Sequence, residues 1–171
     1  MTDHLQNAIA AGRYVMIAGP TAAGKSALAM TLATRLDGVI INADSMQLYR
    51  DLRILTARPD AQDEARIPHR LYGVLDAAER ASVARWLDLS DVAVTAARKT
   101  GKMPIIIGGT GLYFQALTHG LADIPQISPQ IVARSEQILE TAGHRALATE
   151  LDAATAARID LNNPMRVQRA W

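Results

Sequence analysis

The chain has 171 residues, of which 49% are hydrophobic and 20% are charged, with a formal net charge of +1 and no cysteine. This length suits one domain with a proper core, and the lack of cysteine excludes disulfide frameworks and thiolate zinc sites. No apolar run approaches the ~18 residues that span a bilayer, and the first residues lack a signal-peptide pattern, so we expect a soluble, cytoplasmic protein with no membrane partner.

A phosphate-binding motif follows residues 1–13, which we expect to form a short helix or a leader. The apolar segment Tyr14 to Ala18 predicts a strand, and it runs into Gly19-Pro20-Thr21-Ala22-Ala23-Gly24-Lys25-Ser26. This order of strand, glycine-bearing turn and helix is typical of a P-loop, whose amides and helix N-terminus bind a di- or triphosphate. Lys25 would add a mobile positive charge, and the Ser26 hydroxyl would contact a phosphate-bound Mg²⁺, so we expect Mg²⁺ as the cofactor.

The next two elements are a helix and a buried strand. The helix is predicted over residues 24–36 from the spacing of its apolar side chains, Leu28, Leu32 and Leu36. Gly38 is predicted to be the left-handed residue that closes this helix. Val39 to Ile41 is a continuous apolar run, which is typical of a parallel strand covered on both faces.

Asp44 directly follows that strand, and its place beside the P-loop leaves two interpretations open. In P-loop kinases and hydrolases an aspartate at such a place holds Mg²⁺ through water. Alternatively, Asp44 is a general base that faces an acceptor molecule.

The middle of the chain alternates polar segments with predicted helices and strands. Residues 46–70 are irregular and polar, and such a long connection usually lies over a site or is mobile. Leu71 to Leu75 is predicted to be a strand, and residues 82–99 a helix that buries Trp86 on its apolar stripe. Met103 to Ile107 is predicted to be the last strand.

Gly108-Gly109-Thr110-Gly111 follows the last strand and precedes a predicted helix. Its glycines would let a ligand approach the Thr110 hydroxyl and the nearby amides very closely. Since strands that alternate with helices form a parallel sheet, the turns after the three main strands should meet at one edge, where ligands bind.

These elements predict an α/β fold over residues 1–120, with a P-loop NTPase-like parallel sheet flanked by helices. Residues 121–171 read as a small helical segment, in which Ser128 and Asn163 cap helices that begin with a proline.

In its sequence motifs the chain resembles the tRNA dimethylallyltransferases (isopentenyl-diphosphate:tRNA transferases). Five blocks occur in the family's order and cover most of residues 14–120: Gly19 to Ser26, Asn42 to Tyr49, Thr56 to Pro59, Ile67 to His69, and Gly108 to Phe114. Asn162 to Ala170 is similar to a further family block, the start of its tRNA-binding part. The P-loop alone would indicate only a superfamily. The Asp-Ser-Met-Gln and Gly-Gly-Thr-Gly-Leu-Tyr blocks together indicate a far narrower group of proteins.

The resemblance implies transfer of a dimethylallyl group from dimethylallyl diphosphate to N6 of the adenosine beside the anticodon of tRNA. Gly19 to Ser26 would bind the diphosphate, with Lys25 neutralising its growing charge and Mg²⁺ near Ser26. Asp44 would act as the general base, and Thr110 would assist at the transferring centre. The tRNA anticodon stem-loop would be held by seven residues: Asp44, Ser45, Met46, Gln47, Thr110, Arg166 and Arg169.

Three positions depart from the family pattern, namely Arg70, Val132 and Met165, and these changes would weaken RNA contacts more than the chemistry. Because family members continue with further helices, we expect this chain to be a truncated form, and we expect a monomer. Two other functions stay open: a P-loop small-molecule kinase that binds ATP, and a shortened, non-catalytic relative that binds phosphate.

Overall fold

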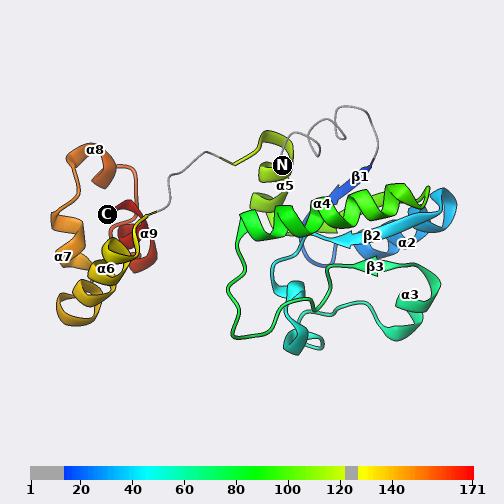
Figure 1. Ribbon diagram of the computed structural model, residues 1–171, viewed down its shortest axis with the longest axis horizontal. Helices are drawn as coiled ribbons and strands as arrows, with labels where there is room; N and C mark the ends of the chain where they lie inside the picture. The colour runs from blue at the N-terminus through cyan, green and yellow to red at the C-terminus, as the bar shows by residue number, and fades with distance from the viewer. Residues whose placement is uncertain (1–13, 122–126) are drawn as a thin grey trace. The chain divides into compact units, whose positions relative to one another are not determined.

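A computed structural model describes residues 14–121 and 127–171 (Figure 1). The described residues form two compact units, which lie within these two ranges. The helix or leader predicted over residues 1–13 lies outside the described residues. Within the described ranges, no helix has the length and apolar character needed to cross a membrane.

The first unit is built on a four-stranded parallel sheet. Its strands are β1 (Val15–Ala18), β2 (Gly38–Asn42), β3 (His69–Arg70) and β4 (Met103–Gly108), in the spatial order β1-β4-β2-β3. Because β4 lies between β1 and β2, the turns that follow these three strands emerge side by side at one edge of the sheet. The predicted parallel α/β sheet is thereby confirmed.

Helices cover both faces of this sheet. On one face, Ile40, Ile105 and Ile107 pack against α2 (Lys25–Leu36), and on the other Val39, Ile41 and Ile106 pack with α4 (Val83–Lys99) and α5 (Gly111–His119). Alternate side chains of a strand point to opposite faces, so β2 supplies both cores and all five of its residues are buried. The expectation of a strand covered on both faces is confirmed.

Of the predicted leucine stripe of α2, Leu32 packs against the core beneath the sheet, whereas Leu28 and Leu36 point largely to the surface. Leu28 is 50% exposed and Leu36 is 42% exposed, whereas the sheet-facing Ala29 and Ala33 are almost completely buried. The P-loop fixes where this helix begins, and small side chains let the helix lie close to the strands. The spacing predicted the helix correctly but not its buried face.

The predicted role of Gly38 is also wrong. The left-handed residue that closes α2 is Asp37, with φ 47°, and Gly38 already belongs to β2. A Cβ at Gly38 would lie 2.8 Å from Cδ1 of Ile105 and 3.0 Å from the Cα of Ala33. Glycine is therefore required here by close packing between α2 and β4, and not by the backbone angle.

The third strand lies earlier than predicted. The structure places β3 at His69–Arg70, where it pairs with Ile40 and Ile41, whereas Leu71 has φ 65° and leaves the strand. Leu75 makes only an isolated bridge to Tyr49. The apolar run that suggested a strand is explained by core packing, because Leu71 and Leu75 are both buried.

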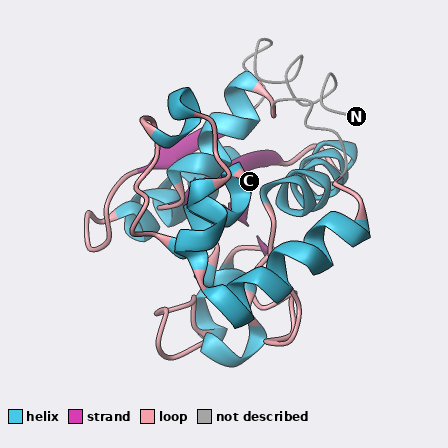
Figure 2. Ribbon diagram, turned by 90° about the vertical axis from the view of Figure 1, so that its left-hand side faces the viewer, coloured by secondary structure: helices cyan, strands magenta, loops and turns pink. Residues whose placement is uncertain are grey.

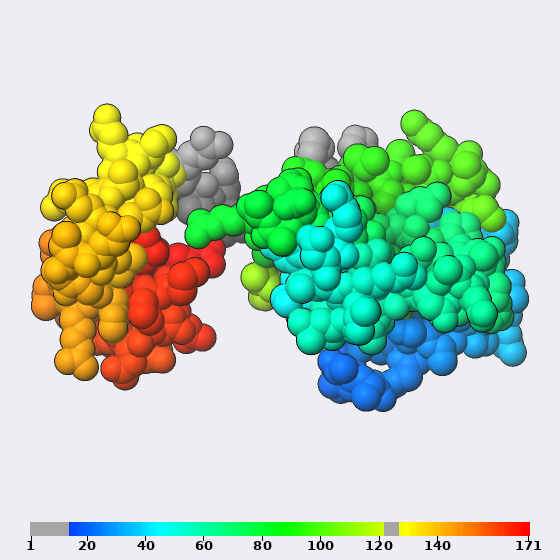
Figure 3. Space-filling view, turned by 90° about the horizontal axis from the view of Figure 1, so that it is seen from below, coloured from blue at the N-terminus to red at the C-terminus, as the bar shows by residue number. Residues whose placement is uncertain are grey.

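The polar connection after β2 is ordered and covers much of the face seen in Figure 3. It contains two short 3₁₀ helices, η1 (Met46–Leu48) and η2 (Arg50–Leu52), and the helix α3 (Ala61–Arg66). Asp60 caps α3 by accepting hydrogen bonds from two backbone N–H groups at 2.8 Å. Gln47 Nε2 donates to the carbonyl of Thr56 at 2.8 Å, which anchors the connection near its start.

The prediction for Trp86 is confirmed. The helix α4 begins after Ser82, whose side chain caps it, and Trp86 is fully buried on the apolar side of this helix. Its ring stacks on that of Tyr113 in α5, with a centroid distance of 4.4 Å. Trp86 therefore belongs to the core and offers no surface for stacking a base.

The second unit is helical. Its residues 127–171 form α6 (Pro129–Ala142), α7 (His144–Thr149), α8 (Ala153–Ala156) and α9 (Pro164–Ala170), with no strand within that range (Figure 2). The predicted caps are confirmed, since the side chains of Ser128 and Asn163 accept hydrogen bonds from N–H groups of the first turns. Leu147 and Val167 form its buried centre.

The fold predicts a severe effect of substituting Gly108, the last residue of β4. A Cβ at this position would overlap the backbone carbonyl of Ala43, so Gly108→Ala should lower the free energy of unfolding by about 3 kcal/mol or more. Urea denaturation measures this change. Gly111→Ala is the matched control, because a Cβ there meets open space at the start of α5 and should leave the stability unchanged or slightly higher. Equal stabilities of the two variants would contradict this packing.

Candidate functional site

The P-loop connects β1 to α2 by a tight turn. Gly24 and Ala22 both have left-handed backbone angles, with φ 75° and 64°, and the helix begins at Lys25. The Lys25 side chain crosses the turn, because its Nζ donates to the carbonyl of Pro20 at 2.6 Å. Such a turn directs backbone N–H groups and the positive end of a helix dipole to one place, which suits an anion.

The Asp44 carboxylate lies next to this loop. Asp44 is half-buried after the end of β2, and its Oδ1 accepts a hydrogen bond from the N–H of Met46 at 3.0 Å. A Cβ built on Gly109 would lie 3.6 Å from Oδ2 of Asp44 and 3.7 Å from the carbonyl oxygen of Gly19. The carboxylate and the start of the P-loop therefore flank Gly109, whose missing side chain keeps the space between them open.

Thr110 holds the turn that follows Asp44. Its Oγ1 accepts a hydrogen bond from the N–H of Ser45 at 3.0 Å and donates to the Ser45 hydroxyl at 3.4 Å. Its own N–H donates to the carbonyl of Ala43 at 3.3 Å. The structure thus brings together the three turns expected to converge, although the Thr110 hydroxyl contacts Ser45 and does not cap α5.

Asn42 is a buried polar residue that sequence reasoning did not single out. Its side-chain amide bonds to both the N–H and the carbonyl of Asp44, each at 2.9 Å. The available signal was an asparagine two residues before Asp44, since asparagine side chains commonly bond to the backbone two residues on.

The charge of Asp44 also acts on nearby aromatic residues. Burial is the main cause that raises the pKa of the Tyr72 hydroxyl, and the Asp44 carboxylate adds to it. Burial likewise raises the pKa of Tyr113, with smaller contributions from Tyr49 and Asp44. Both phenols are therefore neutral at physiological pH.

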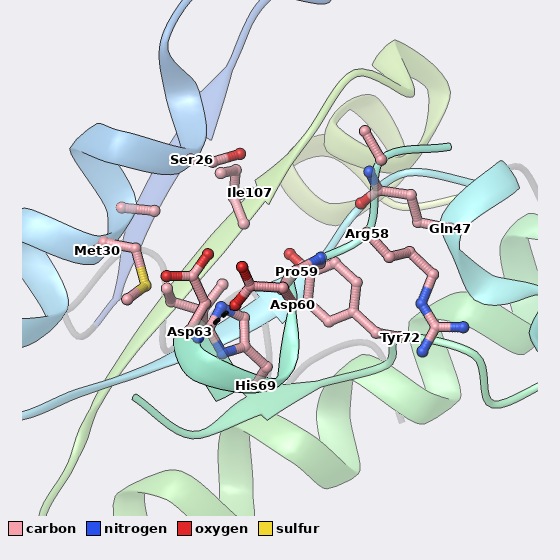
Figure 4. A pocket seen from close by; sticks show the side chains of 13 residues that line it. Ser26, Met30, Gln47, Arg58, Pro59, Asp60, Asp63, His69, Tyr72 and Ile107 are labelled. Carbon is pink, nitrogen blue, oxygen red and sulfur yellow. Dashed lines mark hydrogen bonds between the residues drawn. The ribbon is translucent and has the colours of Figure 1, made fainter. Parts of the chain in front are cut away.

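A cavity of ≈ 190 Å³ opens beside the P-loop (Figure 4). Ser26 reaches it from α2, and Tyr72 reaches it from the segment after β3. Its lining combines polar and apolar side chains; the other lining residues are Ala29, Met30, Ile40, Gln47, Ala57, Arg58, Pro59, Asp60, Asp63, His69 and Ile107. The arrangement can hold a small polar ligand next to the P-loop serine.

Three polar residues that line this cavity, Asp60, Asp63 and Tyr72, were not singled out from the sequence. Asp60 and Asp63 belong to the connection that was predicted to be irregular, and Tyr72 belongs to a segment that was predicted to be a strand. The Asp60 cap before α3 was the signal that could have located this part, because its side chain bonds two helical N–H groups.

The described ranges contain no group of three or more histidine, aspartate or glutamate side chains arranged to hold a metal ion. Ser26 is exposed at the first turn of α2. A metal at this place would therefore take few protein ligands, as Mg²⁺ does when substrate phosphates and water complete its shell.

Arg166 and Arg169 lie in the second unit. Both are exposed, three residues apart on α9, which places them on the same side of that helix. Met165 and Val132, which depart from the family pattern, are exposed in the same unit, and Arg70 is exposed in the first unit.

Known proteins similar to this chain point to one family. The family pattern described as IPP transferase matches residues 47–171, and that described as isopentenyl transferase matches residues 12–80. The tRNA dimethylallyltransferase of Rhodospirillum rubrum is 54% identical over 160 residues, which are 92% of this chain and 49% of the relative. A tRNA dimethylallyltransferase of Rhodopseudomonas palustris is 55% identical, over 93% of this chain and 51% of the relative.

Solved structures agree with these matches. A eukaryotic dimethylallyltransferase acting on tRNA is similar with a TM-score of 0.72 and 31% identity, over 91% of this chain and 40% of that one. The tRNA isopentenylpyrophosphate transferase of Bacillus halodurans is similar with a TM-score of 0.63 and 37% identity, over 92% and 54% of the two chains. The chain spans about half the length of the curated relatives it matches. On these matches, the chain belongs to the IPP transferase family.

Proposed function

We propose that this chain carries the donor-binding and catalytic part of an enzyme that transfers a dimethylallyl group from dimethylallyl diphosphate to N6 of the adenosine beside the anticodon of tRNA. The names of its relatives support this proposal. The observation that carries it is the position of the Asp44 carboxylate, which flanks Gly109 together with the start of the P-loop. A base and an anion site so close together suit a reaction in which an anion leaves as a proton is removed.

In this proposal the P-loop binds the diphosphate of the donor. The backbone N–H groups of residues 19–26, apart from Pro20, and the positive end of α2 face the phosphate oxygens, and the Lys25 ammonium turns from the Pro20 carbonyl to them. Ser26 would supply one hydroxyl ligand to a Mg²⁺ that the substrate and water otherwise coordinate. When bound, the metal neutralises negative charge on the diphosphate.

Asp44 is proposed to act on the acceptor. The bond between the allylic carbon and the diphosphate oxygen breaks, its electron pair leaves with the diphosphate, and the N6 lone pair forms the new bond to carbon. N6 is a weak nucleophile because its lone pair is delocalised into the ring, and removal of its proton by the Asp44 carboxylate compensates for this. The positive charge of the P-loop favours departure of the diphosphate.

The RNA contacts are proposed from two regions. Asp44 to Gln47, with Thr110, would contact the target base, which must leave its stack to reach a site of this kind. Arg166 and Arg169 would contact the RNA backbone, to which exposed arginines bind well. We also propose that the chain acts in the cytoplasm as a monomer.

Replacing Lys25 should abolish most of the donor affinity. Lys25→Ala removes a charge-assisted contact to phosphate, so we expect affinity for dimethylallyl diphosphate with Mg²⁺ to fall roughly 10- to 100-fold. Isothermal titration calorimetry in the absence of RNA measures this. Lys99→Ala, which removes an exposed lysine at the end of α4, is the control and should bind normally. Equal affinity of both variants would contradict the proposed diphosphate site.

Replacing Asp44 should separate chemistry from donor binding. Asp44→Asn keeps the shape but removes the base, so the transfer rate to an anticodon stem-loop should fall roughly 10²- to 10⁴-fold while donor affinity is kept. Mass spectrometry of the digested nucleosides measures the product. Asp88→Asn, the same change at an exposed position on α4, should transfer normally.

Three results would each exclude part of the proposal. Normal transfer by Asp44→Asn would refute the assigned base. Consumption of ATP with a phosphorylated acceptor, and no response to the prenyl donor, would favour a P-loop kinase. Thermal stabilisation by the donor without any prenylated product would indicate a phosphate-binding relative that is not an enzyme.

A further inference from the structure

Asn42 is the one polar residue in an otherwise apolar buried run. It is the last residue of β2, two positions before Asp44, and it is completely buried. Ile40, Ile41 and Ala43 around it are buried and apolar. Burying an amide is unfavourable unless its hydrogen bonds are made inside the protein. A polar side chain at this position therefore requires specific partners.

Asp44 provides two of the three partners, and Leu71 provides the third. Asn42 Oδ1 accepts a hydrogen bond from the Asp44 N–H at 2.9 Å, and Nδ2 donates to the Asp44 carbonyl at 2.9 Å and to the Leu71 carbonyl at 3.0 Å. Both amide hydrogens are used, as an asparagine amide has only two. One side chain thus holds the peptide groups before and after the Cα of Asp44.

The carboxylate of Asp44 continues this arrangement. Its Oδ1 accepts from the Met46 N–H at 3.0 Å, which leaves Oδ2 on the side of Gly109. With the backbone fixed by Asn42 and one carboxylate oxygen fixed by Met46, the other oxygen has a defined direction. We infer that Asn42 is the positioning residue for the Asp44 carboxylate. This inference rests on the proposed function, in which that carboxylate removes the N6 proton.

If Asn42 had a purely structural role, replacing it would affect the stability of the fold and not the direction of the Asp44 carboxylate. The bond to the Leu71 carbonyl stabilises a residue with φ 65°, and the Asn42 carbonyl accepts from Trp86 Nε1 at 2.8 Å. Losing these contacts would lower stability without changing the direction of the carboxylate. The two roles can be separated, because they depend on different atoms of Asn42 and its neighbours.

Three variants separate them. Asn42→Ala removes every side-chain contact. Asn42→Ser removes the bond to Leu71, which serine is too short to reach, but its hydroxyl can still accept from the Asp44 N–H in the turn that serine forms. Trp86→Phe is the structural control, because it removes a buried hydrogen bond to the Asn42 carbonyl and leaves the Asn42 amide intact.

The first measurement is the transfer rate at saturating donor and RNA, together with donor affinity. Asn42→Ala should lower kcat roughly 10- to 100-fold with donor affinity changed less than about threefold, since a small misplacement of a reacting group has an effect of this size. Asn42→Ser should recover most of kcat, although its melting temperature falls. Trp86→Phe should keep kcat at a lowered melting temperature. Equal losses of kcat in all three variants would overturn the inference.

The second measurement does not depend on activity. Hydrogen exchange of the Met46 amide reports whether the Asp44 carboxylate stays in place, because this amide donates to Oδ1. It should be roughly fivefold faster or more in Asn42→Ala, but unchanged in Asn42→Ser and in Trp86→Phe. Unchanged Met46 exchange in Asn42→Ala would overturn the inference. If the variants show the expected pattern of Met46 exchange but the wild-type chain makes no prenylated product, the proposed function is refuted and the positioning role of Asn42 stands.

Discussion

The backbones of β2 and β4 approach each other so closely at Ala43 and Gly108 that position 108 has no room for a side chain. Ala43 donates to the carbonyl of Ile107 at 2.6 Å and accepts from the N–H of Thr110 at 3.3 Å. This contact fixes the distance between two turns that the sequence separates by about sixty residues. The geometry of Asp44, Gly109 and the P-loop depends on it.

Short polar contacts then define the site on this rigid edge. Asn42 and Thr110 hold the turn around Asp44 from the two sides, one through its buried amide and the other through the Ser45 N–H. The P-loop adds left-handed residues and the start of a long helix. The proposed anion site and the Asp44 carboxylate thus lie at neighbouring strand ends, which is where parallel sheets commonly bind ligands.

Features with a local physical signature could be predicted from the sequence. The P-loop, the caps at Ser128 and Asn163, and the burial of Trp86 follow from residue types and spacing. The buried face of α2, the position of β3 and the role of Gly38 did not, because contacts between distant segments decide them. The family blocks indicated the residues of the site, whereas the direction of the Asp44 carboxylate and the wall of the cavity required the fold.

A crystal structure of the chain with dimethylallyl diphosphate and Mg²⁺ tests the central claim most directly. We expect the diphosphate to contact the amides of residues 19–26, with the allylic carbon on the side of Gly109 that faces the Asp44 carboxylate. A diphosphate bound elsewhere, or an allylic carbon on the opposite side of the P-loop from Asp44, would contradict the claim that these two elements form one site.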